Sequence, residues 1–195
     1  MAFSRTVKSS RPEAGMSVIE VAVASLLLTI GMLASGLTMV AGISSMHISQ
    51  QRLIAKQKAR ETLESVFTAR NTQNITYNQI QNVSDETEYT PPVDGIFLDG
   101  WQPIKAAGDD GIVNTADDED PIETTTLAGP DGLVGTADDL TLTLNDYQRR
   151  IAIANILLEN GNPDPDIRRI TVEVRFRVRN RWEVVTFSSR VSRFS

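Results

Sequence analysis

Residues 15–47 read GMSVIEVAVASLLLTIGMLASGLTMVAGISSMH, and this stretch decides the fold. It carries one acidic residue, Glu20, and the 26 residues from Val21 to Met46 carry no charge. As a helix, that uncharged run would be about 39 Å long, enough to cross a hydrocarbon core about 30 Å thick with some tilt. The sequence therefore predicts one membrane span near the N-terminus.

Basic residues precede the apolar run and predict its orientation. Arg5, Lys8 and Arg11 lie on its N-terminal side. The positive-inside rule places that side in the cytoplasm. We therefore expect a single pass through the inner membrane, with everything after about His47 outside the cytoplasm.

Glu20 separates this segment from a cleaved secretory signal. The apolar part of such a signal is about 7–15 residues long, carries no carboxylate and precedes a small-residue cleavage site. A carboxylate at the membrane edge costs about 2–3 kcal/mol or more, so it is usually kept for a partner. A plain signal-anchor helix remains the alternative interpretation.

Gly15, Met16 and Glu20 together resemble the processing site of type IV pilins and pseudopilins. The resemblance implies that a prepilin peptidase removes residues 1–15 as a leader peptide and that Met16 becomes the N-methylated first residue. Glu20 would then be the fifth residue of the mature chain and pair with the terminal amine of a neighbouring subunit. A carboxylate and an ammonium can offset each other's burial in a low-dielectric medium. The implied partners are other pilin or pseudopilin subunits, the peptidase and an inner-membrane assembly platform.

Two departures from the family pattern narrow the resemblance. Met16 stands where the family usually has Phe, and residues 16–70 contain no proline, whereas many major pilins have one in this helix. The unkinked pattern fits a minor pilin or a minor pseudopilin of type II secretion at least as well as a major subunit. The resemblance covers about residues 15–70.

The helical pattern continues beyond the span but becomes amphipathic. Ile54, Leu63, Val66 and Phe67 recur at helical spacing among charged residues. We expect one helix over residues 16–70, with the span at 16–46 and the remainder docked on a sheet. Residues 71–195 would form the head.

Charge is distributed unevenly in the predicted head. Residues 85–166 hold 19 Asp and Glu against 3 Lys and Arg, whereas residues 167–195 hold 8 Arg and 2 Glu. The whole chain has a net charge of −6 and no cysteine. This pattern does not fit a basic nucleic-acid-binding domain, and we predict no specific nucleic-acid partner. The lack of cysteine excludes disulfides and Cys-ligated metals.

Two acidic segments match each other within an insert at about residues 105–140. The first repeat (108–118) reads GDDGIVNTADD and the second repeat (129–139) reads GPDGLVGTADD. Calcium binds six to eight oxygens on a tightly turned backbone, so both repeats are candidate calcium sites, although neither is an EF-hand. An acidic loop without an ion is the alternative. The candidate ligands are Asp109, Asp110, Asn114, Asp117, Asp118, Asp131, Gly135, Asp138 and Asp139.

Strand patterns fill the rest of the head. Residues 140–144 alternate Leu and Thr, and residues 167–193 alternate apolar and charged residues around a turn, which predicts a C-terminal β-hairpin. Residues 147–158 fit a helix or a strand. Gly161, Pro163 and Pro165 predict a turn between these segments. The hairpin at the C-terminus also resembles the ending of minor pilins and pseudopilins.

The sequence thus predicts an α+β, pilin-like fold: a long N-terminal helix packed on a small antiparallel sheet with an acidic loop insert. A single His, no Cys and no Gly-rich phosphate loop leave no catalytic set, so we expect a structural protein and not an enzyme. The implied role is a minor subunit of a type IV pilus or a related secretion or competence pseudopilus. The alternative is a membrane-anchored surface protein that binds calcium or another ligand through its head without polymerising.

Overall fold

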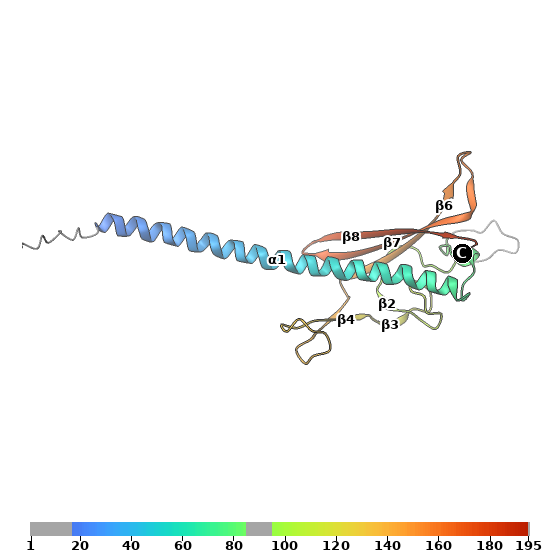
Figure 1. The fold of residues 1–195 in the computed structure, drawn as a ribbon, viewed down its shortest axis with the longest axis horizontal. Coiled ribbons are helices and arrows are strands. Elements are labelled where there is room, and N and C mark those ends of the chain that lie inside the picture. The colour runs from blue at the N-terminus through green and yellow to red at the C-terminus, as the bar shows by residue number, and fades with distance from the viewer. Residues whose placement is uncertain (1–16, 85–94, 195) are drawn as a thin grey trace, which may run out of the picture. The chain divides into compact units, whose positions relative to one another are not determined.

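The computed structural model describes residues 17–84 and 95–194, apart from the side chain of Asp120. These residues form helix α1 (Val18–Asn71), the short 3-10 helix η1 (Tyr77–Gln79) and eight strands (Figure 1). The strands are β1 (Gln102–Pro103), β2 (Lys105–Ala106), β3 (Glu119–Ile122), β4 (Thr124–Leu127), β5 (Leu140–Thr143), β6 (Tyr147–Leu157), β7 (Pro163–Val178) and β8 (Arg181–Ser192). The fold is α+β, as predicted, with the long helix contacting an antiparallel sheet.

The chain divides into two compact units at His47 and Ile48. The first unit holds the described part of the apolar segment, which is helical from Val18 onward. The second unit, from Ile48 to the C-terminus, holds the rest of α1 and all of the strands. We call this second unit the head.

The main sheet of the head has the strand order β1-β6-β7-β8, and every neighbouring pair is antiparallel. Strand β6 settles the segment that the sequence left open between helix and strand. The predicted C-terminal hairpin is present as β7 and β8, which are paired from Ile167 with Ser192 to Val178 with Arg181.

The start of β7 corrects one sequence prediction. Pro163 and Pro165 do not form the turn but lie in β7, and Pro163 pairs with Leu157 beyond an irregularity in the register. The turn is earlier, where Gly161 N donates to Leu158 O at 2.9 Å. Proline fits at the first residues of a strand, where a missing N–H disturbs few ladder bonds.

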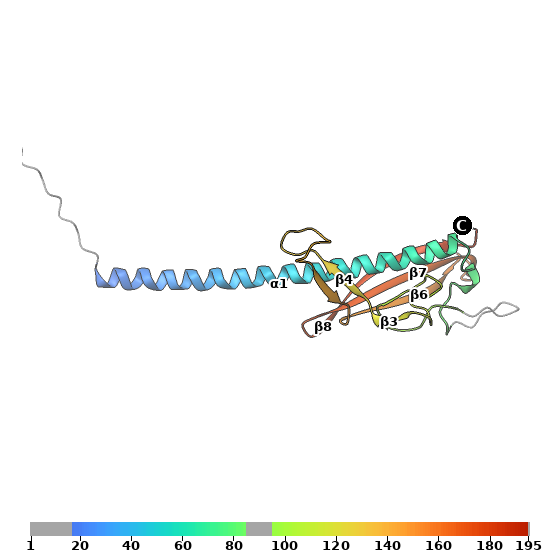
Figure 2. The same ribbon diagram turned by 90° about the horizontal axis from the view of Figure 1, so that it is seen from below.

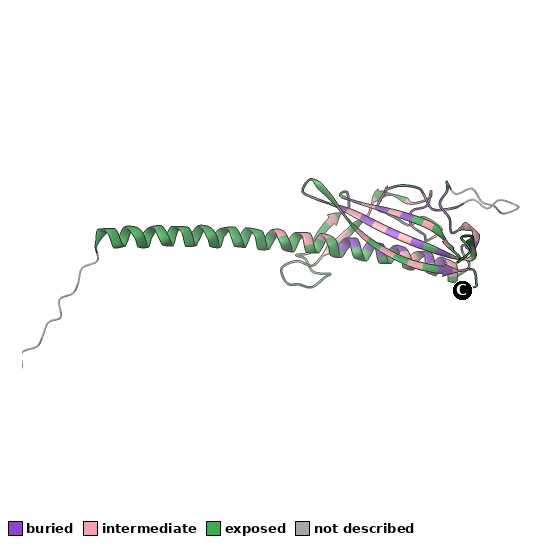
Figure 3. Cartoon of the chain, turned by 90° about the horizontal axis from the view of Figure 1, so that it is seen from above, coloured by how far each residue is buried: buried purple, intermediate pink, exposed green. Residues whose placement is uncertain are grey.

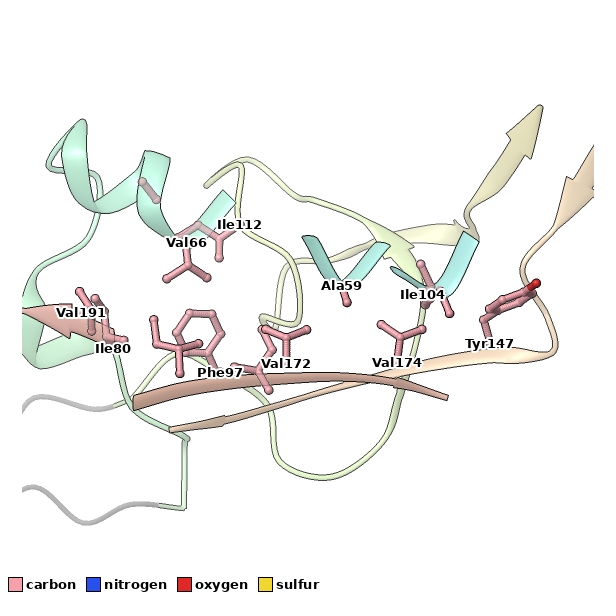
Figure 4. Packing of buried hydrophobic residues seen from close by; sticks show 14 of the residues in the cluster. Ala59, Val66, Ile80, Phe97, Ile104, Ile112, Tyr147, Val172, Val174 and Val191 are labelled. Atoms are coloured by element: carbon pink, nitrogen blue, oxygen red, sulfur yellow. The ribbon is translucent and has the colours of Figure 1, made fainter. Parts of the chain in front are cut away.

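The core lies between the head part of α1 and the sheet. Ala55, Ala59, Thr62, Val66 and Ala69 recur every three or four residues and are buried, so one helix stripe faces the strands. These mostly small residues let the helix approach the sheet closely. In Figure 3 buried and exposed residues alternate along the strands, and Figure 4 shows the core side chains. The inward residues of β7 include Ile170, Val172, Val174 and Phe176.

The predicted acidic insert folds as two consecutive β-hairpins. Strand β2 pairs with β3, and β4 pairs with β5. The first repeat connects β2 to β3, and the second repeat connects β4 to β5. In Figure 1 these small hairpins lie across α1 from β7 and β8. Each repeat is therefore the end loop of its own hairpin.

Candidate functional site

The apolar part of α1 exposes side chains that are unsuited to water. Val18 and Ile19 are 86% and 76% exposed, and the most apolar window of the helix has no buried residue. By length and composition, this helix can cross a membrane. An apolar surface of this extent needs lipid or another protein around it. Glu20 lies in the first turn of this helix, where the helix macrodipole favours a carboxylate.

Polar side chains within the apolar segment bond to the helix itself. The hydroxyls of Thr29 and Ser35 donate to the carbonyls of Ser25 and Gly31 at 2.7 and 2.8 Å. Such bonds satisfy a hydroxyl without water, as a hydrocarbon medium requires. Gly15 and Met16, the predicted cleavage and methylation residues, lie outside the described residues.

The first repeat is held by bonds from its own backbone and from one hydroxyl. Asp110 Oδ1 accepts from Ile112 N at 2.7 Å, and Asp117 Oδ2 accepts from Asp110 N at 3.3 Å. The Thr115 hydroxyl donates to Asp117 Oδ1 at 2.7 Å. The carboxylates therefore point into the loop and replace the backbone partners that a tight turn lacks.

The second repeat reproduces this network residue by residue. Thr136 Oγ1 donates to Asp138 Oδ1 at 2.6 Å, and Leu133 N donates to Asp131 Oδ1 at 2.8 Å. Asp131 N donates to Asp138 Oδ2 at 3.2 Å, as Asp110 N does to Asp117 in the first repeat. The similarity between the two sequences is therefore a similarity of hydrogen-bonded loop structure.

Glycines at matched positions permit this loop. A Cβ on Gly108 would lie 2.3 Å from Asp117 O, and a Cβ on Gly129 would lie 2.3 Å from Asp138 O. Both distances are far below contact distance, so these positions tolerate only glycine without rearrangement. Asn114 has a φ of 70°, and its counterpart Gly135 has a φ of 97°. Asn and Gly are the residues that adopt a positive φ most readily, which explains why one repeat has Asn and the other has Gly at this position.

The carboxylates do not form a ready calcium cage. Among residues 17–84 and 95–194, no three or more acidic or His side chains are placed to hold one metal ion. The four Asp of the TADD ends (Asp117, Asp118, Asp138 and Asp139) accept bonds from within their own repeats. Asp109 is exposed. Calcium binding stays a prediction, and it would require the loops to exchange these hydrogen bonds for ion contacts.

The two repeats differ in their surroundings. Ile112 is fully buried in the core, whereas its counterpart Leu133 is 62% exposed. Asn114 Nδ2 donates to Leu98 O at 2.9 Å and fastens the first repeat to a neighbouring segment. Gly135 has no side chain that could do this. The first repeat is thus part of the core, and the second projects from it.

Charged side chains surround the inner end of the first repeat. Arg149 Nη2 lies 3.3 Å from Asp118 Oδ2, and Lys58 forms ion pairs with Glu61 at 2.8 Å and with Glu123. Burial alone would lower the pKa of Lys58, but the hydrogen bonds that its ammonium donates to Glu123 and Glu61, together with their negative charge, raise it above its usual value. These charged side chains come from α1, from the first hairpin and the residue after it, and from β6, so electrostatic interactions connect the three parts.

The pKa values of the loop carboxylates shift in opposite directions. Burial raises the pKa of Asp110, although Ile112 N donates to it. The Thr115 hydroxyl lowers the pKa of Asp117, and Thr136 lowers that of Asp138 in the same way. The matched threonines therefore keep one carboxylate of each repeat ionised.

Sequence reasoning missed Arg149, Arg168 and Asn82. Arg168 Nη1 donates to Tyr77 O at 2.8 Å and to Ile80 O at 2.9 Å. Asn82 bonds through its amide to Ile151 O and to Ile153 N, both at 2.9 Å. The sequence could have indicated that Arg149 is buried, because it lies between Tyr147 and Ile151 on the inward face of β6. This inference is possible only if residues 147–158 are first recognised as a strand.

Comparison of the chain with protein-family models, with curated proteins and with solved structures finds no match.

Proposed function

We propose that this chain is a structural minor subunit of a type IV pilus or a related secretion or competence pseudopilus. Before assembly it would be a single-pass inner-membrane protein with a cytoplasmic N-terminus and the head outside the cytoplasm. After processing at Gly15 and Met16 it would enter the filament through its N-terminal helix. The assembly partners would be other pilin or pseudopilin subunits.

The observation that carries the proposal is Glu20 in the first turn of a helix whose next 26 residues, Val21 to Met46, carry no charge. That helix is 54 residues long, and only residues from its second half are buried against the head. A carboxylate at that position needs a cationic partner once it leaves water. The described segment from residue 17 to residue 47 contains no Lys or Arg, so a neighbouring subunit's amine is a suitable partner.

The fold of the head supports the same proposal. A pilin-like subunit needs a small domain that covers the second half of a long helix and leaves the first half free. Here the stripe from Ile54 to Ala69 packs on the head, whereas Val18 to Met46 have no buried residue. The chain therefore has the two parts that filament assembly through a helix would use.

Two substitutions test the proposal in a host with a prepilin peptidase and an assembly system. Gly15→Val is expected to block processing and leave a chain of higher mass in the inner membrane. Glu20→Ala is expected to be processed normally but to be missing from sheared filaments. Ser25→Ala is a matched control, because it changes a hydroxyl in the same helix without touching charge. Normal incorporation of Glu20→Ala would contradict the proposal.

The alternative is a membrane-anchored surface protein that uses its head without polymerising. The exposed second repeat supports this alternative, because an exposed loop can bind a ligand or a partner whether or not the helix assembles into a filament. The two proposals differ in one respect that can be tested directly. A non-polymerising anchor would tolerate Gly15→Val and Glu20→Ala without loss of its surface function.

A further inference from the structure

The second repeat exposes two neighbouring apolar residues, and the counterpart of the first of them is buried in the first repeat. Leu133 and Val134 are 62% and 69% exposed, although they lie in a loop whose matched copy places Ile112 in the core. Leu157 and Leu158 are another neighbouring pair of exposed apolar residues on the head, but Leu133 differs from them because its counterpart in a matched loop, Ile112, is buried. The first repeat shows what such a tip packs into: an apolar space beside a guanidinium.

The carboxylates of the two repeats differ in their partners outside the loop. Asp118 Oδ2 accepts from Arg149, whereas Asp139 Oδ2 accepts from Gly135 N and Thr136 N of its own repeat. Asp131 and Asp138 of the second repeat are exposed and form no ion pair with a Lys or Arg among the described residues. The second repeat therefore presents carboxylates to solvent without a cation.

The head offers a surface of the required kind at the turn between β7 and β8. A hollow of about 720 Å³ lies there, with apolar walls and arginines at its edge. Trp182 is 44% exposed, and Glu183 is neutralised by Arg52 at 2.6 Å, so the charge of the hollow is set by arginines. The hollow is lined by Ile48, Val178, Arg179, Asn180, Arg181, Trp182 and Glu183.

The two surfaces are complementary in charge and in chemistry. The second repeat holds Asp131, Asp138 and Asp139 and no basic residue, whereas residues 177–182 hold three arginines and no acidic residue. We infer that the second repeat of one copy docks into the hollow at the β7–β8 turn of a second copy. Leu133 and Val134 would enter the apolar part, and the arginines of the turn would face the exposed Asp131 and Asp138.

The arrangement of the head favours a second copy over contact within one chain. Figures 1 and 2 place the second repeat and the β7–β8 turn on opposite sides of α1. Because the loop and the hollow lie on opposite sides of α1, one pair of copies would not form the contact twice, so the contact is heterologous and adds copies head to tail. The inference concerns the head alone and does not depend on the proposed role of Glu20.

Disulfide trapping tests this contact in the full chain, which has no native cysteine. Two differently tagged copies, one with Val134→Cys and one with Asn180→Cys, are co-expressed in a bacterial inner membrane and mildly oxidised. A mixed dimer is expected. The control replaces Asn180→Cys with Leu158→Cys, an exposed residue (44%) in the turn at the other end of β7. This control pair is expected to give little product.

Two further variants test the chemistry of the contact. Leu133→Ser in the Val134→Cys copy is expected to reduce the mixed dimer about tenfold or more, because it removes a large apolar side chain from the interface. Arg179→Glu with Arg181→Glu in the other copy is expected to do the same. The melting temperature of Leu133→Ser should stay unchanged, since the residue is exposed. Equal trapping of both cysteine pairs, or trapping unaffected by Leu133→Ser, would overturn the inference.

Discussion

Arg149 Nη2 lies 3.3 Å from Asp118 Oδ2, and the two side chains are only 2% and 8% exposed. Asp118 also accepts from Asn114 N at 2.9 Å. One carboxylate therefore bonds both to the backbone of its own loop and to Arg149 of strand β6. Burial lowers the pKa of Arg149, and Asp118 opposes that shift. The pair is the electrostatic connection between the first repeat and the main sheet.

Removing one member of this pair should destabilise the head strongly. Arg149→Ala is expected to lower the free energy of unfolding by about 3–5 kcal/mol, because Asp118 is left as a buried charge without its cation. Urea unfolding of the full chain in detergent measures this. Arg60→Ala is the matched control, since the Arg60–Glu64 pair is exposed and such pairs contribute about 0–1 kcal/mol. Equal effects of the two substitutions would contradict this account of Arg149.

Matched truncations in the two repeats should have very different effects on stability. Ile112→Ala is expected to cost about 2–5 kcal/mol, as for other buried aliphatic side chains. Leu133→Ala, at the same position of the second repeat, should change the free energy of unfolding by less than about 0.5 kcal/mol. Both values come from the same urea titration. A large effect of Leu133→Ala would show that the second repeat packs on its own head.

Asp110 and Asp117 of the first repeat should protonate in a fixed order. The lowered pKa of Asp117 stabilises the fold above the unfolded value of about 3.9, and this contribution is lost as the pH falls through the folded value. The raised pKa of Asp110 has the opposite sign: its ionised form disfavours the fold at neutral pH, and protonation relieves this. On acidification Asp110 should therefore protonate before Asp117.

Carboxyl-carbon NMR titration of the full chain in micelles measures this order. Thr115→Val should raise the pKa of Asp117 toward its ordinary value, because the hydroxyl donor is lost. Thr136→Val makes the same change in the second repeat and should leave Asp117 unaffected. If Asp110 and Asp117 titrate together, the hydrogen bond from Thr115 does not act as described.

Calcium titration separates a hydrogen-bonded loop from an ion-bound one. If the calcium sites predicted from sequence form, millimolar calcium is expected to raise the melting temperature, and Asp117→Asn with Asp138→Asn to abolish the increase. An unchanged melting temperature would show that the carboxylates keep their bonds to backbone N–H groups and would contradict the calcium prediction. Magnesium at the same concentration is the control for ionic strength.

Much of the fold could be predicted from periodicity. Val66 and Phe67 lie on the helical stripe that the sequence indicated, and the alternation from Ile170 to Val178 gave the inward face of β7. Residues 147–158 could not be assigned, because an apolar run of that length fits a helix as well as a strand. Without that strand, the inward position of Arg149 could not be recognised.

The acidic repeats show a second limit of sequence reasoning. Their spacing revealed that they match, but both calcium and a simple loop fitted the same residues. The structure adds that Thr115 and Thr136 bond to the carboxylates, and that one repeat is buried whereas the other is exposed. That difference depends on which hairpin lies against α1. Asn114, whose amide donates to Leu98 O where the second repeat has Gly135, is a trace of it in the sequence, but its meaning depends on knowing that Leu98 lies nearby.

The mass of the mature N-terminus tests the central proposal most directly. The full chain is expressed with a prepilin peptidase, purified from the inner membrane and measured intact and after proteolysis. We expect a chain that begins at N-methylated Met16, so that Glu20 is its fifth residue. An intact chain that still begins at Met1 in the presence of an active peptidase would contradict the pilin-like assignment.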